Sequence, residues 1–380
     1  MFSKSGSYNL HIPEHYMQSK YYTFSPSPLC KSELVKTDTE LALLLAKAHR
    51  LIGILEGMSR FIPNINIIES MLIKREAVFS CRIDGFEESF EEAIKTSEEG
   101  NKMVSYSQGY IKAVNYGKEK LPENHFTNQF LCEIHKNLMA DKNDEEAGQF
   151  RKTQTFFGPR VFTESFPDYN PPAPDEMGKA LIDFEKYINC NDEVDVLTKA
   201  ALIHYQFETI HPFISGNGKL GRILNGLFIS EKKILSRQLL CISKYLWLNK
   251  IEYFDRLKEV QRFGNFEQWV KFFVKALISA AEDSINIINR LLALREKTVA
   301  KIMTLGKLSR TATLLLEYLE KKPIIDIKTA SETLNLSFNT VSKSVESLRE
   351  IGILKKRNDS IRYRYFAYEE YLNILDDGRM

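Results

Sequence analysis

The 380-residue sequence has few cysteines, no long apolar run and almost no net charge. Five cysteines without a CxxC pair indicate neither a disulfide framework nor a structural zinc site. No segment reaches the ~18 uncharged residues of a membrane span, and the N-terminus MFSKSGSYNLHIPEH lacks the apolar core of a signal peptide. With 52 basic and 50 acidic residues, the net charge of +2 excludes a polycationic or wholly disordered chain. These absences predict a cytoplasmic protein with no membrane partner.

The length predicts about two or three domains, and the periodicity of apolar residues predicts a mainly α fold. Residues 1–38 carry tyrosines and the run SPSP, which favours an extended arm because proline restricts its own backbone and that of its predecessor. From Thr39, apolar residues recur every three or four positions, with Asp38 as N-cap and Pro63 as stop. We therefore expect a helical domain over 39–300 and a small separate domain over 301–380.

One segment departs from the helical period. Residues 148–162, GQFRKTQTFFGPRVF, mix Thr and Phe around Gly158-Pro159, a pattern that predicts a β-hairpin. A proline-rich loop follows before the next helix.

The C-terminal 80 residues have the order helix, short turn, helix and two-stranded wing, and so resemble a winged helix-turn-helix. Polar residues at the start of the second helix and basic residues beside the wing suit a nucleic-acid backbone. Residues 301–380 nevertheless hold 14 basic and 11 acidic residues, a modest excess for a DNA-binding domain. DNA binding and protein docking are equally compatible with this domain, and a structural cap is the third alternative.

The segment most informative about chemistry is HPFISGNGKLGR, residues 211–222, which leads directly into an apolar helical run. Gly216-Asn217-Gly218 at a helix N-terminus can direct backbone N–H groups at a phosphate. Lys219 and Arg222 would add positive charge, and His211 is the nearby group with a neutral-pH base. A lone histidine or a lone Gly-Asn-Gly is usually structural, but their combination at this spacing favours a site that binds a polyphosphate.

These residues closely resemble the Fic family, whose pattern is HPFxxGNG(K/R)xxR. The resemblance extends to the lead-in helix around Phe207-Glu208, to a flap formed by the hairpin, and to the segment from Tyr245 to Phe273. It implies a Fic-type helical core with a β-hairpin flap, and an adenylyltransferase (AMPylator) that transfers AMP from ATP to a hydroxyl of a protein.

By this resemblance, His211 is the general base, and Gly216, Asn217 and Gly218 form the anion hole. Lys219 would contact the phosphate chain and Arg222 the γ-phosphate, while Tyr253 and Gln261 occupy positions that line the adenine pocket in relatives. The flap residues that would align a target segment by strand addition are Thr153, Gln154, Thr155, Phe156 and Phe157.

Ser215 departs from the family pattern. Active relatives commonly have an acidic residue here, which holds the metal that bridges the α- and β-phosphates. A serine hydroxyl is a weak ligand for the expected Mg²⁺ or Mn²⁺, because these ions prefer charged oxygen ligands. The substitution bears on the rate, on the metal dependence and on the reaction itself.

A second motif, Ser80-Cys-Arg-Ile-Asp84-Gly85, is similar to the (S/T)xxxE(G/N) inhibitory helix of some Fic proteins, here expected around residues 76–90. The resemblance implies that Asp84 pairs with Arg222 and so removes the partner of the γ-phosphate. Asp in place of Glu shortens the reach by one methylene.

Two functions stay open. The first is an autoinhibited adenylyltransferase that modifies an unidentified protein or itself. The second is a nucleotide-sensing, DNA-binding transcriptional regulator with a weakened Fic site. A homodimer is compatible with either function.

Overall fold

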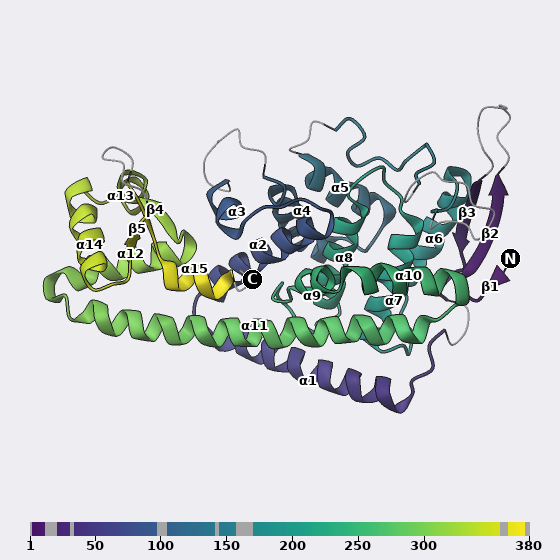
Figure 1. Cartoon of the computed structure of the whole chain (residues 1–380), viewed down its shortest axis with the longest axis horizontal. Helices are drawn as coiled ribbons and strands as arrows, with labels where there is room; N and C mark the ends of the chain where they lie inside the picture. The colour runs from purple at the N-terminus through teal and green to yellow at the C-terminus, as the bar shows by residue number, and fades with distance from the viewer. Residues whose placement is uncertain are drawn as a thin grey trace.

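Helix α11 (Phe266–Met303) runs along one side of the molecule and connects its two ends (Figure 1). Its 38 residues correspond to a length of about 57 Å. Helix α1 (Thr39–Phe61) packs along it, and Asp38 caps α1 by accepting a hydrogen bond of 2.8 Å from the N–H of Leu41. The predicted cap and the predicted stop before Pro63 are both confirmed.

The computed structural model describes residues 2–11, 21–30, 34–96, 105–140, 144–156, 170–357 and 364–376. Its mainly helical architecture agrees with the fold class that the sequence predicts. Above α11 lie the body helices, which are α2 (Ile65–Ile83), α3 (Phe90–Thr96), α4 (Gln108–Lys120), α5 (Asn128–Met139), α6 (Pro174–Asn189), α7 (Val196–Ile210), α8 (Asn217–Glu231), α9 (Ile242–Leu248) and α10 (Lys250–Phe263).

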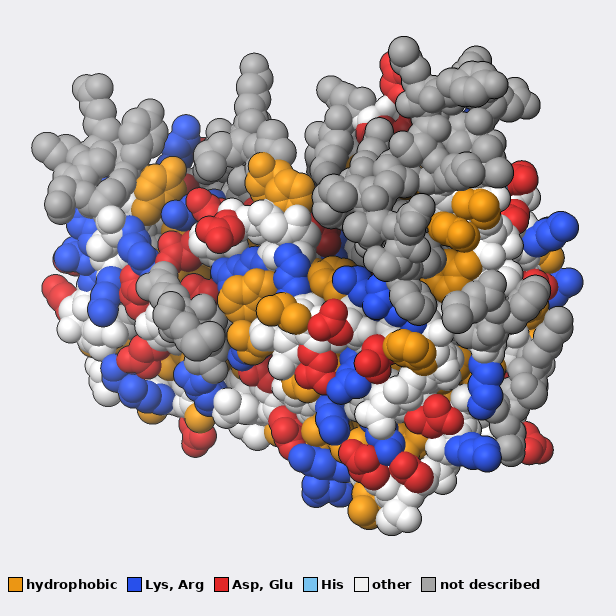
Figure 2. Space-filling model, turned by 45° about the vertical axis from the view of Figure 1, so that its right-hand side comes forward, with side chains coloured by type: hydrophobic (Ala, Val, Ile, Leu, Met, Phe, Trp, Pro, Cys, Tyr) orange, Lys and Arg blue, Asp and Glu red, His pale blue; other side chains and the backbone are white. Residues whose placement is uncertain are grey.

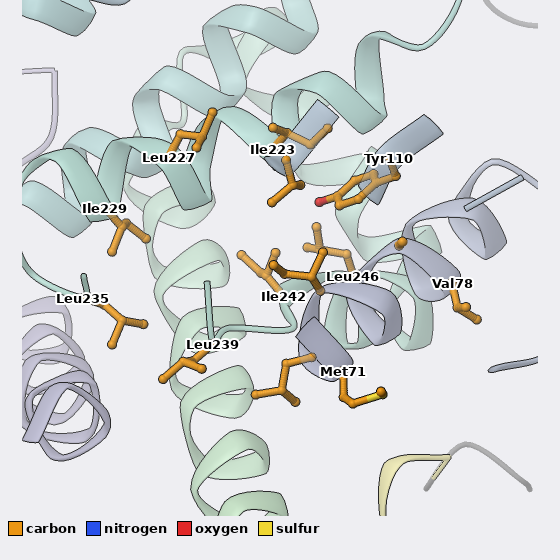
Figure 3. Packing of buried hydrophobic residues seen from close by; sticks show 14 of the residues in the cluster. Met71, Val78, Tyr110, Ile223, Leu227, Ile229, Leu235, Leu239, Ile242 and Leu246 are labelled. Atoms are coloured by element: carbon orange, nitrogen blue, oxygen red, sulfur yellow. The ribbon is translucent and has the colours of Figure 1, made fainter. Parts of the chain in front are cut away.

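Apolar side chains from four of these helices meet in the centre of the body. Figure 3 shows Met71 of α2, Tyr110 of α4, Ile223 of α8 and Ile242 of α9 close together. All four are buried. This packing holds α2 and α8 in place and thereby determines how the polar residues on them face each other.

The N-terminal arm forms a sheet. Strands β1 (Phe2–Ser3), β2 (Gly6–His11) and β3 (Tyr21–Pro26) are antiparallel in the order β1-β2-β3. The side-chain amide of Asn170 donates to Tyr22 O, and Phe24 N donates to Asn170 O. The extended backbone predicted from SPSP is present in β3, but its pairing partners were not predicted.

The structure differs from two sequence-based expectations in the described residues. The helix expected around 76–90 is wrong beyond Ile83: α2 ends there, Gly85 is left-handed with φ of 86°, and α3 starts at Phe90. In the expected hairpin, residues 157–162 lie outside the described residues. The described residues 148–156 contain no strand, and Arg151 N donates instead to Pro212 O.

The C-terminal unit begins after α11, which runs to Met303 and so passes slightly beyond the expected boundary at residue 301. Its elements are α12 (Ser309–Lys321), β4 (Ile324–Asp326), α13 (Ile327–Leu334), α14 (Phe338–Glu350), β5 (Lys355–Lys356), β6 (Tyr365–Ala367) and α15 (Glu369–Leu375), with sheet order β4-β6-β5. The winged-helix interpretation stays a prediction. The unit contacts the body where Arg75 Nε donates to Leu375 O at 2.8 Å.

On the face shown in Figure 2, basic and acidic side chains alternate over the described surface without forming a large field of one sign. Among the described helices, none combines the length and the apolar character that crossing a membrane requires.

Candidate functional site

The turn between α7 and α8 contains the motif, and it begins with an unusual backbone conformation. His211 has φ of 48° and ψ of 61°, a left-handed conformation that is costly for a residue with a side chain. Its N–H donates to Phe207 O, and its carbonyl accepts from Nε of Arg151 at 2.9 Å. The surrounding contacts therefore stabilise a strained turn at the residue expected to act as the base.

Hydrogen bonds and packing of its own side chains stabilise the loop after His211. The amide of Asn217 accepts from Phe213 N at 2.9 Å and donates to Phe213 O at 2.8 Å. Phe213 is fully buried and stacks on the ring of His135, with centroids 3.8 Å apart. The contribution of Asn217 to an anion hole is thus its backbone N–H, because its side chain is used within the loop.

His135 supports this loop from α5. Its Nδ1 accepts a hydrogen bond from Gly148 N at 2.9 Å, which assigns the proton of the neutral ring to Nε2. Nε2 then donates to the Ser215 carbonyl at 2.9 Å. His135 thereby connects the segment that leads into the flap with the motif loop.

The N-terminus of α8 presents unpaired backbone donors. Gly216 precedes it with φ of 78°, and the first intrahelical bond runs from Leu220 N to Gly216 O. The N–H groups of Asn217, Gly218 and Lys219 come before that bond, so they are available to an anion at the positive end of the helix dipole. This geometry is the one expected for a phosphate.

Arg222 is held by the end of α2. Its Nε donates to Ser80 Oγ at 2.7 Å, and its Nη2 donates to Ser80 O at 3.1 Å and to Asp84 Oδ1 at 3.2 Å. Burial opposes the charge, but the neighbouring Asp84 carboxylate holds the pKa of Arg222 above its ordinary value. The remaining nitrogen, Nη1, lies over Gly218, where an added Cβ would stand 3.0 Å from it.

Asp84 also engages Lys219. Its Oδ2 lies 3.3 Å from Lys219 Nζ, which in turn sits 4.9 Å from the centre of the Phe86 ring. Gly85, with its left-handed backbone, turns the chain so that Asp84 and Phe86 both face α8. The structure therefore brings the motif residues Ser80, Asp84 and Arg222 together and adds Lys219 to the group.

The charge state of His211 follows from its surroundings. Burial, together with the positive charge of Arg151, lowers the pKa of His211 to about 3, against smaller opposing effects from the Glu208 carbonyl and Asp84. The imidazole is therefore neutral near pH 7, which is the form a general base requires.

Glu208 places a second titratable group between α7 and α8. Its Oε1 is buried without a hydrogen bond among the described residues, and burial raises the pKa of Glu208 to about 7. A Cβ at Gly221 would lie 2.8 Å from that oxygen. The glycine on α8 thus makes room for the carboxyl group.

The two residues expected in the adenine pocket lie on α10, and both are buried. The hydroxyl of Tyr253 lies 2.8 Å from Nε2 of His204, whose pKa burial lowers to about 3. The backbone carbonyl of Gln261 accepts from Ser5 Oγ at 3.1 Å. The adenine-pocket assignment stays a prediction.

The flap residues are described only in part. Thr153 O accepts from Arg151 Nη1 at 3.2 Å, and Gln154 Nε2 donates to Thr155 O and Pro171 O. Phe156 is 37% exposed and meets the edge of Tyr21, with ring centroids 5.2 Å apart. Phe157 lies outside the described residues.

The donor set around Ser215 does not fit a carboxylate-held metal ion. The residue offers a hydroxyl, its carbonyl is already bonded to His135, and the described residues contain no group of three His, Cys, Asp or Glu that could hold a metal. We therefore derive no step through a metal ion.

His135 and Arg151 are the residues that the sequence interpretation did not single out. A lone histidine or arginine carries no periodic signal, and both act through backbone groups of distant segments. Arg151 lies in the run GQFR, which resembles a Fic flap. That resemblance was the one signal in the sequence that pointed to a role for Arg151.

A half-buried histidine that is neutral near pH 7, a helix N-terminus with available backbone N–H groups and an arginine held by Asp84 thus lie on one helical fold, and this arrangement fits phosphate chemistry. Residues 125–229 match the Fic/DOC family, and residues 42–119 match the Fic/DOC family N-terminal domain. The chain therefore contains a Fic/DOC domain, preceded by the N-terminal segment of that family.

Similar proteins agree with this family. Residues of this chain are 32% identical over 96 positions to "Protein adenylyltransferase Fic" of Drosophila grimshawi and 33% identical over 96 positions to the protein of that name in Nematostella vectensis. Each match covers 25% of this chain, but only 18% and 20% of the respective relative. The crystal structure of a Fic family protein from Desulfovibrio desulfuricans G20 is similar to this chain with a TM-score of 0.57 and 17% sequence identity. The match covers 88% of this chain and 98% of that protein's chain. That structure supports the fold.

Proposed function

We propose that the protein is an adenylyltransferase that transfers AMP from ATP to a side-chain hydroxyl of a protein and is restrained by Asp84. The observation that carries the proposal is the neutral His211 next to the α8 N-terminus, with Arg222 clamped by Ser80 and Asp84. The family and the names of the partial relatives support AMP transfer in general.

In this reaction an imidazole nitrogen of His211 accepts the proton of the target hydroxyl. The hydroxyl oxygen forms a bond to the α-phosphorus of ATP, and the bond between that phosphorus and the bridging oxygen breaks. Pyrophosphate leaves, and AMP remains attached to the target. The backbone N–H groups at the start of α8 stabilise the phosphate charge that develops during transfer.

The restraint follows from the contacts of Arg222. While Asp84 and Ser80 hold two of its nitrogens, the guanidinium lacks the orientation needed to bind a terminal phosphate in a bidentate manner. Asp84 also neutralises Lys219, so a single carboxylate withholds two cations from ATP.

The test is labelling with α-labelled ATP. The wild-type protein, Asp84→Gly and His211→Ala are incubated with a cell lysate, each with Mg²⁺, with Mn²⁺ and with excess chelator. We expect label on protein bands to increase in Asp84→Gly and to disappear in His211→Ala. Equal labelling of all three proteins would contradict the proposal.

Ser215 favours a second candidate function. Without an acidic residue at this position, the site could bind a nucleotide and signal its presence through the C-terminal unit, whose α14 exposes Phe338, Asn339 and Lys343. Measurable ATP binding without label in any variant, together with ATP-dependent binding of the protein to DNA fragments, would support this regulator. Restored labelling in Ser215→Asp would instead indicate an adenylyltransferase limited by its weak metal ligand.

A further inference from the structure

Arg151 lies at the junction of the flap segment and the motif turn. Its side chain donates to four main-chain carbonyls: His211 O at 2.9 Å, Pro172 O at 2.6 Å, Thr153 O at 3.2 Å and Ile210 O at 3.5 Å. Its own N–H donates to Pro212 O at 2.9 Å. One residue thus connects the end of α7, the beginning of the flap and the proline loop before α6.

The charge of Arg151 has no acidic counter-ion in the described part of the chain. The residue is 3% exposed, and none of the ion pairs among the described residues includes it. Burial lowers its pKa to about 10, so it remains protonated near pH 7. A buried, unneutralised cation is costly and can be kept only because carbonyl dipoles accept its hydrogen bonds.

His211 experiences this uncompensated charge directly. The guanidinium is bonded to the carbonyl of His211, so a proton on the imidazole would place a second positive charge beside the first. The other charged or titratable groups near the ring that the structure describes come from α2, α8 and α7. Asp84 at the end of α2 favours the protonated ring, while Lys219 and Arg222 of α8 are paired with Asp84. From α7, Glu208 has a pKa that burial raises to about 7, so its side chain is about half ionised near pH 7.

We propose that Arg151 is a positioning residue with two effects: it ties the flap to the His211–Pro212 turn, and its unneutralised charge keeps the His211 ring in the form that accepts a proton. The proposal deepens the proposed function, on which its relevance to catalysis depends. Its electrostatic part can be measured without any transfer activity.

The first experiment is an NMR titration of the full-length chain labelled at histidine. The signal of His211 is assigned by its absence in His211→Ala, and wild type is compared with Arg151→Gln and Arg151→Lys. We expect the wild-type ring to stay neutral down to about pH 5, the ring in Arg151→Gln to titrate with a midpoint at least about one unit higher than in wild type, and the ring in Arg151→Lys to remain near wild type.

Arg75→Gln is the matched control. Arg75 is also buried, at 1% exposure, but it bonds to Leu375 O and to Asp283 on the far side of α2. Its loss should leave the His211 titration unchanged. A folded Arg151→Gln protein whose His211 titrates as in wild type would overturn the electrostatic part of the proposal.

The second experiment measures transfer kinetics in the Asp84→Gly background. Arg151→Lys keeps the charge but loses the planar fork, so we expect kcat to fall about tenfold or more with little change in the KM for ATP, because the flap and the base turn are no longer aligned. In Arg151→Gln, the acidic limb of the kcat/KM profile should also move to higher pH.

The outcomes separate the two claims. If Arg151→Gln does not fold, Arg151→Lys still decides the positioning part, and wild-type kcat in that variant would refute it. If no variant transfers AMP while the His211 midpoint rises in Arg151→Gln, the proposed function fails and the electrostatic role of Arg151 stands.

Discussion

The carboxylate of Asp84 lies 3.2 Å from Nη2 of Arg222, although the two residues are 138 positions apart in the chain. The pair is formed at the C-terminal end of α2, where Asp84 is the residue that ends the helix. A second oxygen of the same carboxylate reaches Lys219 at 3.3 Å. The shorter side chain of Asp, compared with Glu, is therefore long enough to contact both cations of α8.

Removing this carboxylate should strengthen ATP binding. Asp84→Asn keeps the size of the side chain but removes the negative charge that pairs with Arg222 and Lys219. We expect the affinity for ATP to rise about tenfold, because both cations can then form charge-assisted bonds to phosphate. Isothermal titration calorimetry at a fixed salt concentration measures this affinity. Glu87→Gln, the same charge change at an exposed neighbouring position, should leave the affinity unaltered. An equal increase in ATP affinity in the two variants would show that the change in net charge, and not the loss of the Asp84 contacts, is the cause.

The space that Gly221 leaves for Glu208 should be visible in stability. Gly221→Ala would place a methyl group 2.8 Å from Glu208 Oε1 and 3.2 Å from the Phe207 ring, so we expect a loss of about 1–3 kcal/mol in the free energy of unfolding. Gly178→Ala is the control, because a Cβ there meets nothing within 4 Å on the exposed face of α6, and helix propensity should add about 0.5–1 kcal/mol. Urea denaturation measures the free energy of unfolding of both variants. A Gly221→Ala variant more stable than wild type would contradict the close approach of Gly221 to Glu208.

Glu208 should make stability depend on pH. Its pKa is raised to about 7 in the folded state, so the folded protein binds a proton that the unfolded chain releases between about pH 4.5 and pH 7. This contribution is fully present below the unfolded pKa and is lost as pH rises through about 7. Glu208→Gln should therefore match wild type near pH 5 and exceed it by about 1–3 kcal/mol near pH 8. Denaturation midpoints that differ equally at both pH values would exclude titration of Glu208 as the cause.

His204 and His211 should act in the opposite direction. Each has a pKa lowered to about 3 by burial, so the unfolded chain takes up protons below about pH 6.5 that the folded protein does not bind. Their contribution is present above the unfolded pKa and is lost as pH falls from about 6.5 toward 3. In the Glu208→Gln background, which lacks the opposing titration of Glu208, the free energy of unfolding should decrease steadily as the pH falls over this range. Replacing His211 by Ala should reduce that slope, and an unchanged slope would show that His211 is protonated in the folded state.

Asn217 offers a test of how the motif loop is held. Asn217→Ala removes both bonds to the Phe213 backbone, and we expect unfolding to cost about 1–3 kcal/mol less and ATP affinity to decrease as the loop loosens. Asn249→Ala, which removes a single amide bond to Tyr245 O at the end of α9, should have the smaller effect on stability and none on ATP binding. Unchanged ATP affinity in Asn217→Ala would indicate that the loop keeps its shape without this amide.

The features that the sequence by itself determined are those encoded in contiguous residues. The cap at Asp38, the helical period of α1 and the run from His211 to Arg222 each depend on short-range spacing, because a helix, its cap and an anion-binding turn are built from neighbouring backbone groups. The same run carried the resemblance to the Fic family, and the separate motif from Ser80 to Gly85 carried the expected pairing of Asp84 with Arg222.

Only the tertiary structure decided how that site is supported. Arg151 gathers carbonyls from separate segments, His135 connects Gly148 with Ser215, and Glu208 occupies the space that Gly221 leaves between two helices. The bonds between β3 and Asn170 likewise depend on a partner that is distant in sequence. The physical reason is that the cost of a buried charge or polar group depends on which groups from elsewhere in the chain face it, and local sequence patterns carry no information about those partners.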